Sequence, residues 1–275
     1  MSSSPMLQRA IGSAVVVPVG LLLTLWPFGT LGVAAMLIAL SALEAERLFG
    51  AILGGASGRW AAALLLSPVF GAILGGVPLG AVLAVGTFTL FLAWELRLAL
   101  QSDAEHLAPR ARALIGTVAV AAWLSPLLLL LLLGAGDGGA PSLWLLWLLA
   151  VVWSADTFAL LVGRSIGRRR LAPVLSPRKS VEGLVGGLLA ATAIGGAFGV
   201  LAIGMPLALA VAGSLATAAA AEGGDLLESL IKRAAGAERS SSLIPGHGGV
   251  LDRIDSLIVA TPVAMLVALL ALLPD

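Results

Sequence analysis

The sequence contains no cysteine and only two histidines among its 275 residues. The first absence excludes disulfide bonds and thiolate chemistry, and both together argue against zinc, which takes its ligands largely from these residue types. The chain also lacks the Gly-x-x-x-x-Gly-Lys-Ser/Thr phosphate loop and the His-Glu-x-x-His metal motif. Only 11% of its residues are charged, against roughly 25% in an ordinary soluble domain. The few polar clusters that remain are therefore the candidates for chemistry.

Apolar residues make up 59% of the chain, and the mean hydropathy is +1.06. A helix needs about 20 apolar residues to cross a membrane, and backbone groups in lipid must pair within the chain. Nine runs approach this length, over residues 8–27, 30–49, 60–76, 78–98, 112–133, 143–163, 184–202, 205–226 and 255–273. The sequence therefore predicts an all-α, polytopic integral membrane protein with about nine transmembrane helices.

The basic residues predict the orientation of these helices. If Met1 is cytoplasmic, nine crossings place all 16 Lys and Arg residues in inward-facing segments and none in the outward turns. This distribution follows the positive-inside rule. We therefore expect a multi-pass protein whose charged loops face the cytoplasm.

Polar residues are concentrated in the second half, so we expect an N-terminal transmembrane region over 1–150 and a distinct C-terminal region over 151–275. Asp156 interrupts an apolar run of the second region. A charge is costly at that position, so the side chain needs a nearby partner or a wet cavity. A hydrogen bond between helices is the alternative interpretation.

Three acids stand out in the first region: Glu44 and Glu46 in the second expected helix, and Glu95 in the fourth. The favoured interpretation is that they reach the membrane interface and pair with Arg47 or Arg97. The alternative is that one of them lines a polar cavity, because intramembrane acids are often functional.

The segment from Ser176 to Gly183 combines cations and hydroxyls around a proline. Its polar candidates are Ser176, Arg178, Lys179 and Ser180. Such groups can bind phosphate oxygens. A basic loop that orients the chain and attracts anionic lipid heads has the same composition, and both interpretations remain open.

The eighth expected helix continues beyond its apolar run to Arg233. With 3.6 residues per turn, Asp225, Glu228 and Lys232 share one face, which Ser229 flanks. The alternative interpretation is a row of solvent-exposed ion pairs. Because these charges follow directly on an apolar span, we favour a functional cluster.

A loop with Gly246, His247, Gly248 and Gly249 precedes the last helix. Glycines leave backbone N–H groups uncovered, as an anion-binding loop requires, and a helix start adds a positive dipole end. Asp252, Arg253 and Asp255 follow at that start. Because Mg²⁺ is usually held by one or two carboxylates plus substrate phosphates, the pattern predicts a magnesium–polyphosphate site.

The runs Ser229–Arg233 and Leu243–Ser256, with the spacing between them, resemble the signature of the phosphatidate cytidylyltransferases, also called CDP-diacylglycerol synthases. The resemblance extends upstream through Gly224–Ser229, Ser176–Gly183 and Asp156–Arg164. It covers roughly residues 150–260, whereas the first half is similar only as an apolar helical region.

The resemblance implies an enzyme that converts phosphatidate and CTP to CDP-diacylglycerol and pyrophosphate, with 151–275 as its catalytic region. It implies Mg²⁺ held by Asp225, Asp252 and Asp255, and leaves open a second, monovalent cation. The implied catalytic residues are Asp225, Asp252, Asp255, Lys232 and His247. The implied substrate-binding residues are Ser176, Arg178, Lys179, Ser180, Glu228, Ser229, Arg233, Gly246, Gly248, Gly249 and Arg253.

The implied partners are CTP, phosphatidate in the membrane and other membrane lipids, with no nucleic acid; a homodimer is left open. The implied location is the inner (plasma) membrane, with the active site on the cytoplasmic side. One departure from the family pattern is Glu238-Arg239, where a Lys-Asp pair is usual. The alternatives are therefore the same reaction on another lipid phosphate, such as an isoprenoid ether lipid, and, from a different class, an anion transporter.

Overall fold

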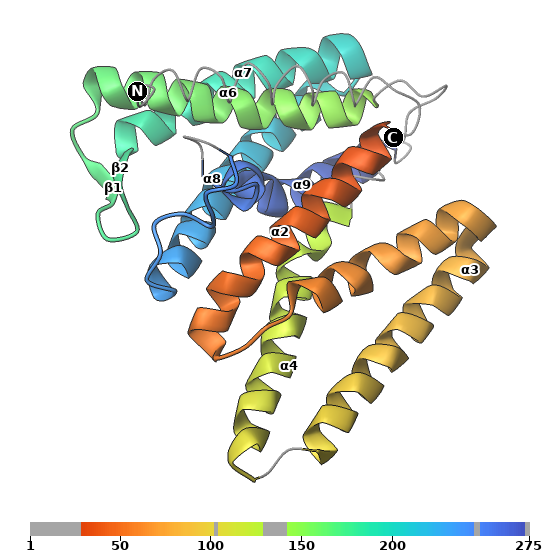
Figure 1. The fold of residues 1–275 in the computed structure, drawn as a ribbon. Helices are drawn as coiled ribbons and strands as arrows, with labels where there is room; N and C mark the ends of the chain where they lie inside the picture. Colours follow the sequence, from red (N-terminus) through yellow and green to blue (C-terminus); the bar gives the residue numbers. More distant parts are fainter. Residues whose placement is uncertain (1–28, 102–103, 129–141, 245–247, 273–275) are drawn as a thin grey trace, which may run out of the picture. The chain divides into compact units, whose positions relative to one another are not determined.

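The computed structural model describes residues 29–101, 104–128, 142–244 and 248–272. Within these ranges the chain is helical apart from one short β-hairpin (Figure 1). The elements are α2 (Gly29–Leu53), α3 (Gly58–Leu100), α4 (Ala104–Leu124), η1 (Ser125–Leu128), α6 (Leu143–Ile166), β1 (Arg170–Ala172), β2 (Ser176–Ser180), α7 (Val181–Phe198), η3 (Gly199–Ile203), α8 (Leu207–Ala234) and α9 (Leu251–Ala271).

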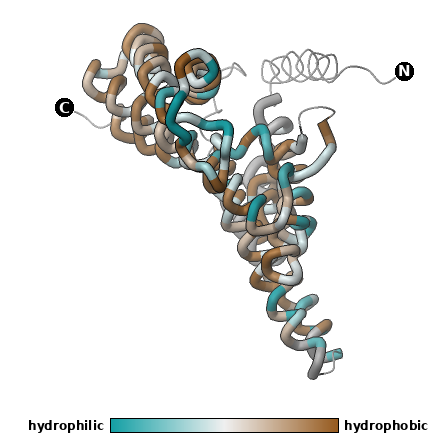
Figure 2. The backbone as a smooth tube through the Cα atoms, turned by 90° about the vertical axis from the view of Figure 1, so that its left-hand side faces the viewer, coloured by the Kyte–Doolittle hydropathy of each residue, from teal (hydrophilic) through white to brown (hydrophobic). Residues whose placement is uncertain are grey.

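Five helical segments of the described residues are long and apolar enough to cross a membrane. They are Ala108–Leu128, Leu143–Ile166, Val181–Ile203, Leu207–Ala234 and Leu251–Ala271. Figure 2 shows hydrophobic residues along much of the helices, with hydrophilic stretches between them. The all-α membrane class is confirmed, whereas the count of about nine is not.

Two of the nine expected helices belong to one element. The runs 60–76 and 78–98 form the single helix α3, which changes direction along its length in Figure 1. Residues 76–78 lie within α3, so no loop separates the two expected helices at that point. The expected helix over 8–27 lies outside the described residues.

The chain divides into two compact units. The first contains Ala34–Leu128 and Ala234–Asp252, and within it α3 packs against α4. The second contains Leu129–Arg233 and Arg253–Asp275, and within it α6 packs against α7. The segment before α9 therefore belongs to the same unit as Glu44, although some 200 residues separate them.

Glycines bring α6 and α7 into close contact. A Cβ atom built on Gly187 would lie 2.6 Å from the carbonyl oxygen of Ala155, and one on Gly183 would lie 2.6 Å from that of Ala159. Buried Trp147 donates its Nε1–H to the carbonyl oxygen of Gly195 at 2.9 Å. Small residues give membrane helices this close approach, which van der Waals contacts then stabilise.

A hairpin connects these two helices. Strand β1 pairs antiparallel with β2, so that Arg170 lies opposite Ser180 and Ala172 opposite Ser176. Ser180 then caps α7, because its Oγ accepts a hydrogen bond from the backbone N–H of Gly183 at 3.1 Å. The segment expected as a loop around a proline is therefore a strand followed by a helix start.

We expect Gly187→Ala to lower the melting temperature in detergent, because the new methyl group would overlap the Ala155 carbonyl. Overpacking of this kind costs about 1–3 kcal/mol. The matched control is Gly223→Ala on α8, where an added Cβ would meet no atom within 4 Å. Alanine favours a helix over glycine, so the control should melt at or above the wild-type temperature. Equal melting of the two variants would contradict the close packing of α6 on α7.

Candidate active site

Lys179 lies between two carboxylates of α8. Its Nζ is 2.6 Å from Glu222 Oε2 and 2.7 Å from Asp225 Oδ2. The hairpin places it there, since Lys179 lies in β2, directly before Ser180, which ends β2 and caps α7. We call Lys179, Glu222 and Asp225 the Lys179 cluster. It joins a basic segment to an acidic helix face that the sequence analysis treated separately.

The charge of Lys179 is held by its partners. Burial alone would lower the pKa of this ammonium group, but the charges and hydrogen bonds of Asp225 and Glu222 outweigh that effect. The pKa of Lys179 is therefore raised above its ordinary value of 10.5. Its side chain is 22% exposed and that of Asp225 is 28% exposed, so both remain accessible to a ligand.

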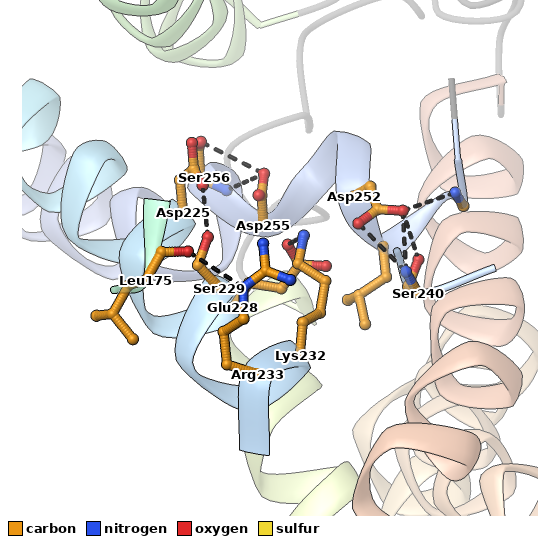
Figure 3. A network of polar contacts seen from close by, with 12 residues as sticks. Leu175, Asp225, Glu228, Ser229, Lys232, Arg233, Ser240, Asp252, Asp255 and Ser256 are labelled. Carbon is orange, nitrogen blue, oxygen red and sulfur yellow. Dashed lines mark hydrogen bonds and ion pairs between the residues drawn. The ribbon is translucent and has the colours of Figure 1, made fainter. Parts of the chain in front are cut away.

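The expected polar face of α8 is present. Lys232 forms an ion pair with Glu228, whose side chain is fully buried. Ser229 donates its hydroxyl to Asp225 Oδ1 at 3.4 Å (Figure 3). Arg233 Nε donates to the carbonyl oxygen of Leu175 at 3.4 Å. The sequence prediction that Asp225, Glu228 and Lys232 lie on one helix is confirmed.

Two further acids lie near the Lys179 cluster. Asp255 on α9 is buried, accepts a hydrogen bond from the backbone N–H of Ser256 at 2.8 Å, and is within electrostatic range of Asp225. Asp156 on α6 is exposed and within range of Lys179 and of the acids around it. Of these charges only Lys179 is opposite in sign to Asp156, so Lys179 is the attractive one among them.

Acids outnumber the lysines paired with them in this region. The acids are Asp156, Glu222, Asp225, Glu228 and Asp255, and the lysines are Lys179 and Lys232. An excess of carboxylate oxygens, without sulfur or imidazole among these groups, suits Mg²⁺ rather than a softer metal. Among the described residues, however, no three acid or histidine side chains are already arranged around a metal position.

Asp252 is engaged by its own loop. Its Oδ2 accepts hydrogen bonds from the backbone N–H of Gly249 at 2.8 Å and from the hydroxyl of Ser240 at 3.0 Å (Figure 3). The backbone N–H of Ser240 contacts the same carboxylate at 3.1 Å. Asp252 thus contacts Ser240 and Gly249 of the segment that precedes α9. Its expected roles in catalysis and in metal binding stay predictions.

The expectation of uncovered backbone N–H groups is wrong for the described part of this loop. The N–H of Gly248 donates to the carbonyl oxygen of Ile244 at 3.1 Å, and that of Gly249 donates to Asp252. Gly248 has a φ of 88°, a left-handed conformation that favours glycine. Gly246 and His247 lie outside the described residues, so their expected roles stay predictions, as do those of Gly248 and Gly249.

The remaining predicted residues differ in accessibility. Arg178 and Arg253 are exposed, Ser176 is partly exposed, and Ser180 is buried at the start of α7. Exposed arginines remain available to phosphate groups. Ser180, by contrast, fixes the segment that carries Lys179.

Sequence reasoning missed Glu222 and underestimated Glu44. Glu222 is 6% exposed and binds Lys179, and Glu44 is 5% exposed. The favoured interpretation of Glu44, an ion pair at the membrane interface, is wrong, because its buried carboxylate binds the loop before α9. An acid inside an apolar run was the available signal in both cases.

The model of the cytidylyltransferase family matches residues 7–271. Among curated relatives, phosphatidate cytidylyltransferases from Haemophilus influenzae, Pseudomonas aeruginosa and Bacillus subtilis are 46%, 44% and 39% identical to this chain. These matches cover 43%, 42% and 41% of the chain and 43%, 43% and 42% of the respective relatives. The chain therefore aligns with less than half of the length of each of these relatives.

We expect Lys179→Met to destabilise the protein by about 2 kcal/mol at neutral pH, because it leaves two carboxylates without their cation. The raised pKa of Lys179 means that the folded state holds this proton more tightly than the unfolded state does. The stabilisation is thus complete below pH 10.5 and is lost as the pH rises through the higher, folded-state value.

Melting curves of wild type and Lys179→Met across pH 7–11.5 test this expectation. The difference in melting temperature should hold to about pH 10 and narrow above it. Lys179→Arg, which keeps the charge, is the matched control and should follow the wild type. A difference that stays constant over the whole range would contradict the ion-pair origin of the effect.

Proposed function

Because the chain belongs to the cytidylyltransferase family, we propose that it converts CTP and phosphatidate to CDP-diacylglycerol and pyrophosphate. The relatives named phosphatidate cytidylyltransferase support this choice of substrates. The structural observation that carries the proposal is the Lys179 cluster with Asp156 and Asp255 beside it, at the polar ends of apolar helices.

The reaction exchanges one bond to phosphorus for another. A phosphate oxygen of phosphatidate forms a bond to the α-phosphorus of CTP, and the bond from that phosphorus to the β-phosphate oxygen breaks. Pyrophosphate leaves with the electron pair of the broken bond. Because the attacking phosphate is already ionised, the protein has mainly to position two anions and to neutralise their charge.

The excess of carboxylates supports a magnesium ion as cofactor, and Asp225 and Asp255 are the residues of this region that would hold it. Asp252, which belongs to the other compact unit, stays a predicted third ligand. Bound Mg²⁺ would neutralise charge on the triphosphate and on the leaving pyrophosphate. Lys179 forms an ion pair with Asp225 and is near enough to contact a phosphate bound there. Lys232 is restrained in the same way by Glu228.

The exposed arginines complete the proposed binding surface. Arg178 and Arg253 would contact phosphate groups of the two substrates, because a guanidinium group binds phosphate with two parallel hydrogen bonds. His247 is proposed to contact the nucleotide phosphates.

The chemistry of the substrates fits a site at the membrane boundary. Phosphatidate carries two acyl chains and CTP is a soluble anion, so the site must be reached from lipid and from water. We propose the cytoplasmic face of the inner membrane, where the basic segments would attract CTP by an electrostatic field that weakens as salt rises.

The assay uses purified protein in detergent with phosphatidate, radiolabelled CTP and Mg²⁺. We expect the wild type to form CDP-diacylglycerol and pyrophosphate in equal amounts. Asp225→Asn should lower turnover by about 100-fold or more, because it removes a charge that the transition state requires while keeping the shape of the side chain. Glu95→Gln, an acid of α3, is the control and should leave turnover unchanged.

Two results would change the proposal. Consumption of CTP with another lipid phosphate, but not with phosphatidate, would reassign the acceptor and implicate Glu238 and Arg239. Absence of turnover with every lipid phosphate would refute the enzyme assignment.

Removal of the divalent cation provides a separate prediction. Chelation with EDTA should abolish product formation, and Mg²⁺ should restore it, whereas Na⁺ at equal ionic strength should not. The physical reason is that the acids exceed the paired lysines, so a triphosphate cannot enter without an added cation. Full activity in EDTA would show that protein cations alone neutralise the substrate.

A further inference from the structure

Glu44 of α2 forms four hydrogen bonds to one loop that is distant in sequence. Its Oε1 accepts from the hydroxyl of Ser241 at 2.7 Å and from the backbone N–H of Val250 at 3.0 Å. Its Oε2 accepts from the hydroxyl of Ser240 at 3.0 Å and from the backbone N–H of Leu251 at 2.8 Å. All five residues belong to the first compact unit.

These contacts use most of the acceptor capacity of the side chain. A carboxylate offers about four acceptor positions, and the donors of Ser241, Val250 and Leu251 fill three of them. The single proton of the Ser240 hydroxyl goes either to Glu44 or to Asp252, which are both within reach of it. Because Glu44 is only 5% exposed, it offers no open path for a metal ion or a substrate. Its contacts therefore indicate a positioning role.

Two of the four donors lie at the start of α9. The first N–H groups of a helix have no partner within the helix, and here those of Val250 and Leu251 donate to Glu44. A negative charge also interacts favourably with the positive end of the helix dipole. Glu44 thus caps α9 from another helix, a task that a neighbouring residue usually performs.

The other two donors lie at the opposite end of the loop. The hydroxyl of Ser240 is 3.0 Å from Glu44 and 3.0 Å from Asp252, so one serine lies between both acids. Gly249 passes closely beside them, and a Cβ atom on it would overlap Ser240 Oγ and the Glu44 carboxylate. Glu44 therefore closes the loop and sets the surroundings of Asp252.

We infer that Glu44 is a positioning residue that fixes residues 240–241 and 250–251, and with them Asp252, for binding of the nucleotide and its metal. This inference rests on the proposed function. Loss of the Glu44 carboxylate should free both pairs of residues and leave Asp252 without a defined position. The effect should appear in CTP binding rather than in binding of the lipid.

The principal variant is Glu44→Gln, whose amide nitrogen cannot accept a hydrogen bond and would face backbone N–H donors. The matched control is Glu46→Gln on the same helix, where the native side chain accepts from the N–H of Gly58 instead. Glu44→Asp keeps the charge on a shorter side chain and should restore part of the function. Ser241→Ala removes one of the hydrogen bonds to Glu44, together with the acceptor of the Leu243 N–H, and serves if Glu44→Gln does not fold.

Two measurements are made on the full-length protein in detergent. The first is the rate of tryptic cleavage after Arg239, an exposed residue next to Ser240, and it needs no substrate. The second is the KM for CTP and for phosphatidate at saturating Mg²⁺. Glu44→Gln should raise the cleavage rate and the KM for CTP about tenfold each, and change the KM for phosphatidate less than about twofold. Glu46→Gln should change none of these values more than about twofold.

Unchanged cleavage in Glu44→Gln would overturn the inference, as would faster cleavage with an unchanged KM for CTP. Equal increases in the KM for CTP and the KM for phosphatidate, with a lower melting temperature, would likewise overturn it, because that pattern reflects stability alone. A wild-type protein that uses no lipid phosphate would refute the proposed function. In that case the cleavage rates of Glu44→Gln and Glu46→Gln still decide whether Glu44 fixes the loop.

Discussion

Carboxylates inside apolar helices must find hydrogen-bond donors or cations, and this requirement organises the polar part of the protein. A charge without a partner is costly in such surroundings. Glu222 and Asp225 bind Lys179, and Glu228 binds Lys232. Glu44 binds two hydroxyls and two backbone N–H groups. Lys232 lies on the same helix as Glu228. The other partners come from segments that these contacts hold in place: the hairpin in one unit and the residues on either side of the loop before α9 in the other.

The two networks differ in what they leave available. Around Lys179 the acids outnumber the lysines that are paired with them. Lys179 and Asp225 are also each about one quarter exposed. A phosphate and a metal ion can therefore replace the internal ion pairs of this region. Glu44 is buried and uses its carboxylate for structural contacts within one loop. The first arrangement suits binding, and the second suits support of a binding residue, Asp252.

The glycines near the start of α9 illustrate how tertiary contacts change a local interpretation. Glycine-rich sequence before a helix is typical of an anion-binding loop, and the anions found there are the carboxylates of Asp252 and Glu44. The physical requirement is the same, since unpaired N–H groups and a helix dipole attract negative charge. The protein meets it with its own side chains, which hold Gly249, Val250 and Leu251 at the start of α9.

The sequence by itself determined the membrane class, the helices α6 to α9, the continuation of α8 through Lys232 and the start of α9 near Asp252. These features follow from apolar run length and helical periodicity, which are local properties. Tertiary structure decided the partners of Lys179, the hairpin that carries it, the single helix formed by residues 58–100 and the role of Glu44. No local sequence pattern predicts these features, because the donors that bind a buried carboxylate are set by the tertiary fold. The donors to Glu44, for example, lie some 200 residues further along the chain.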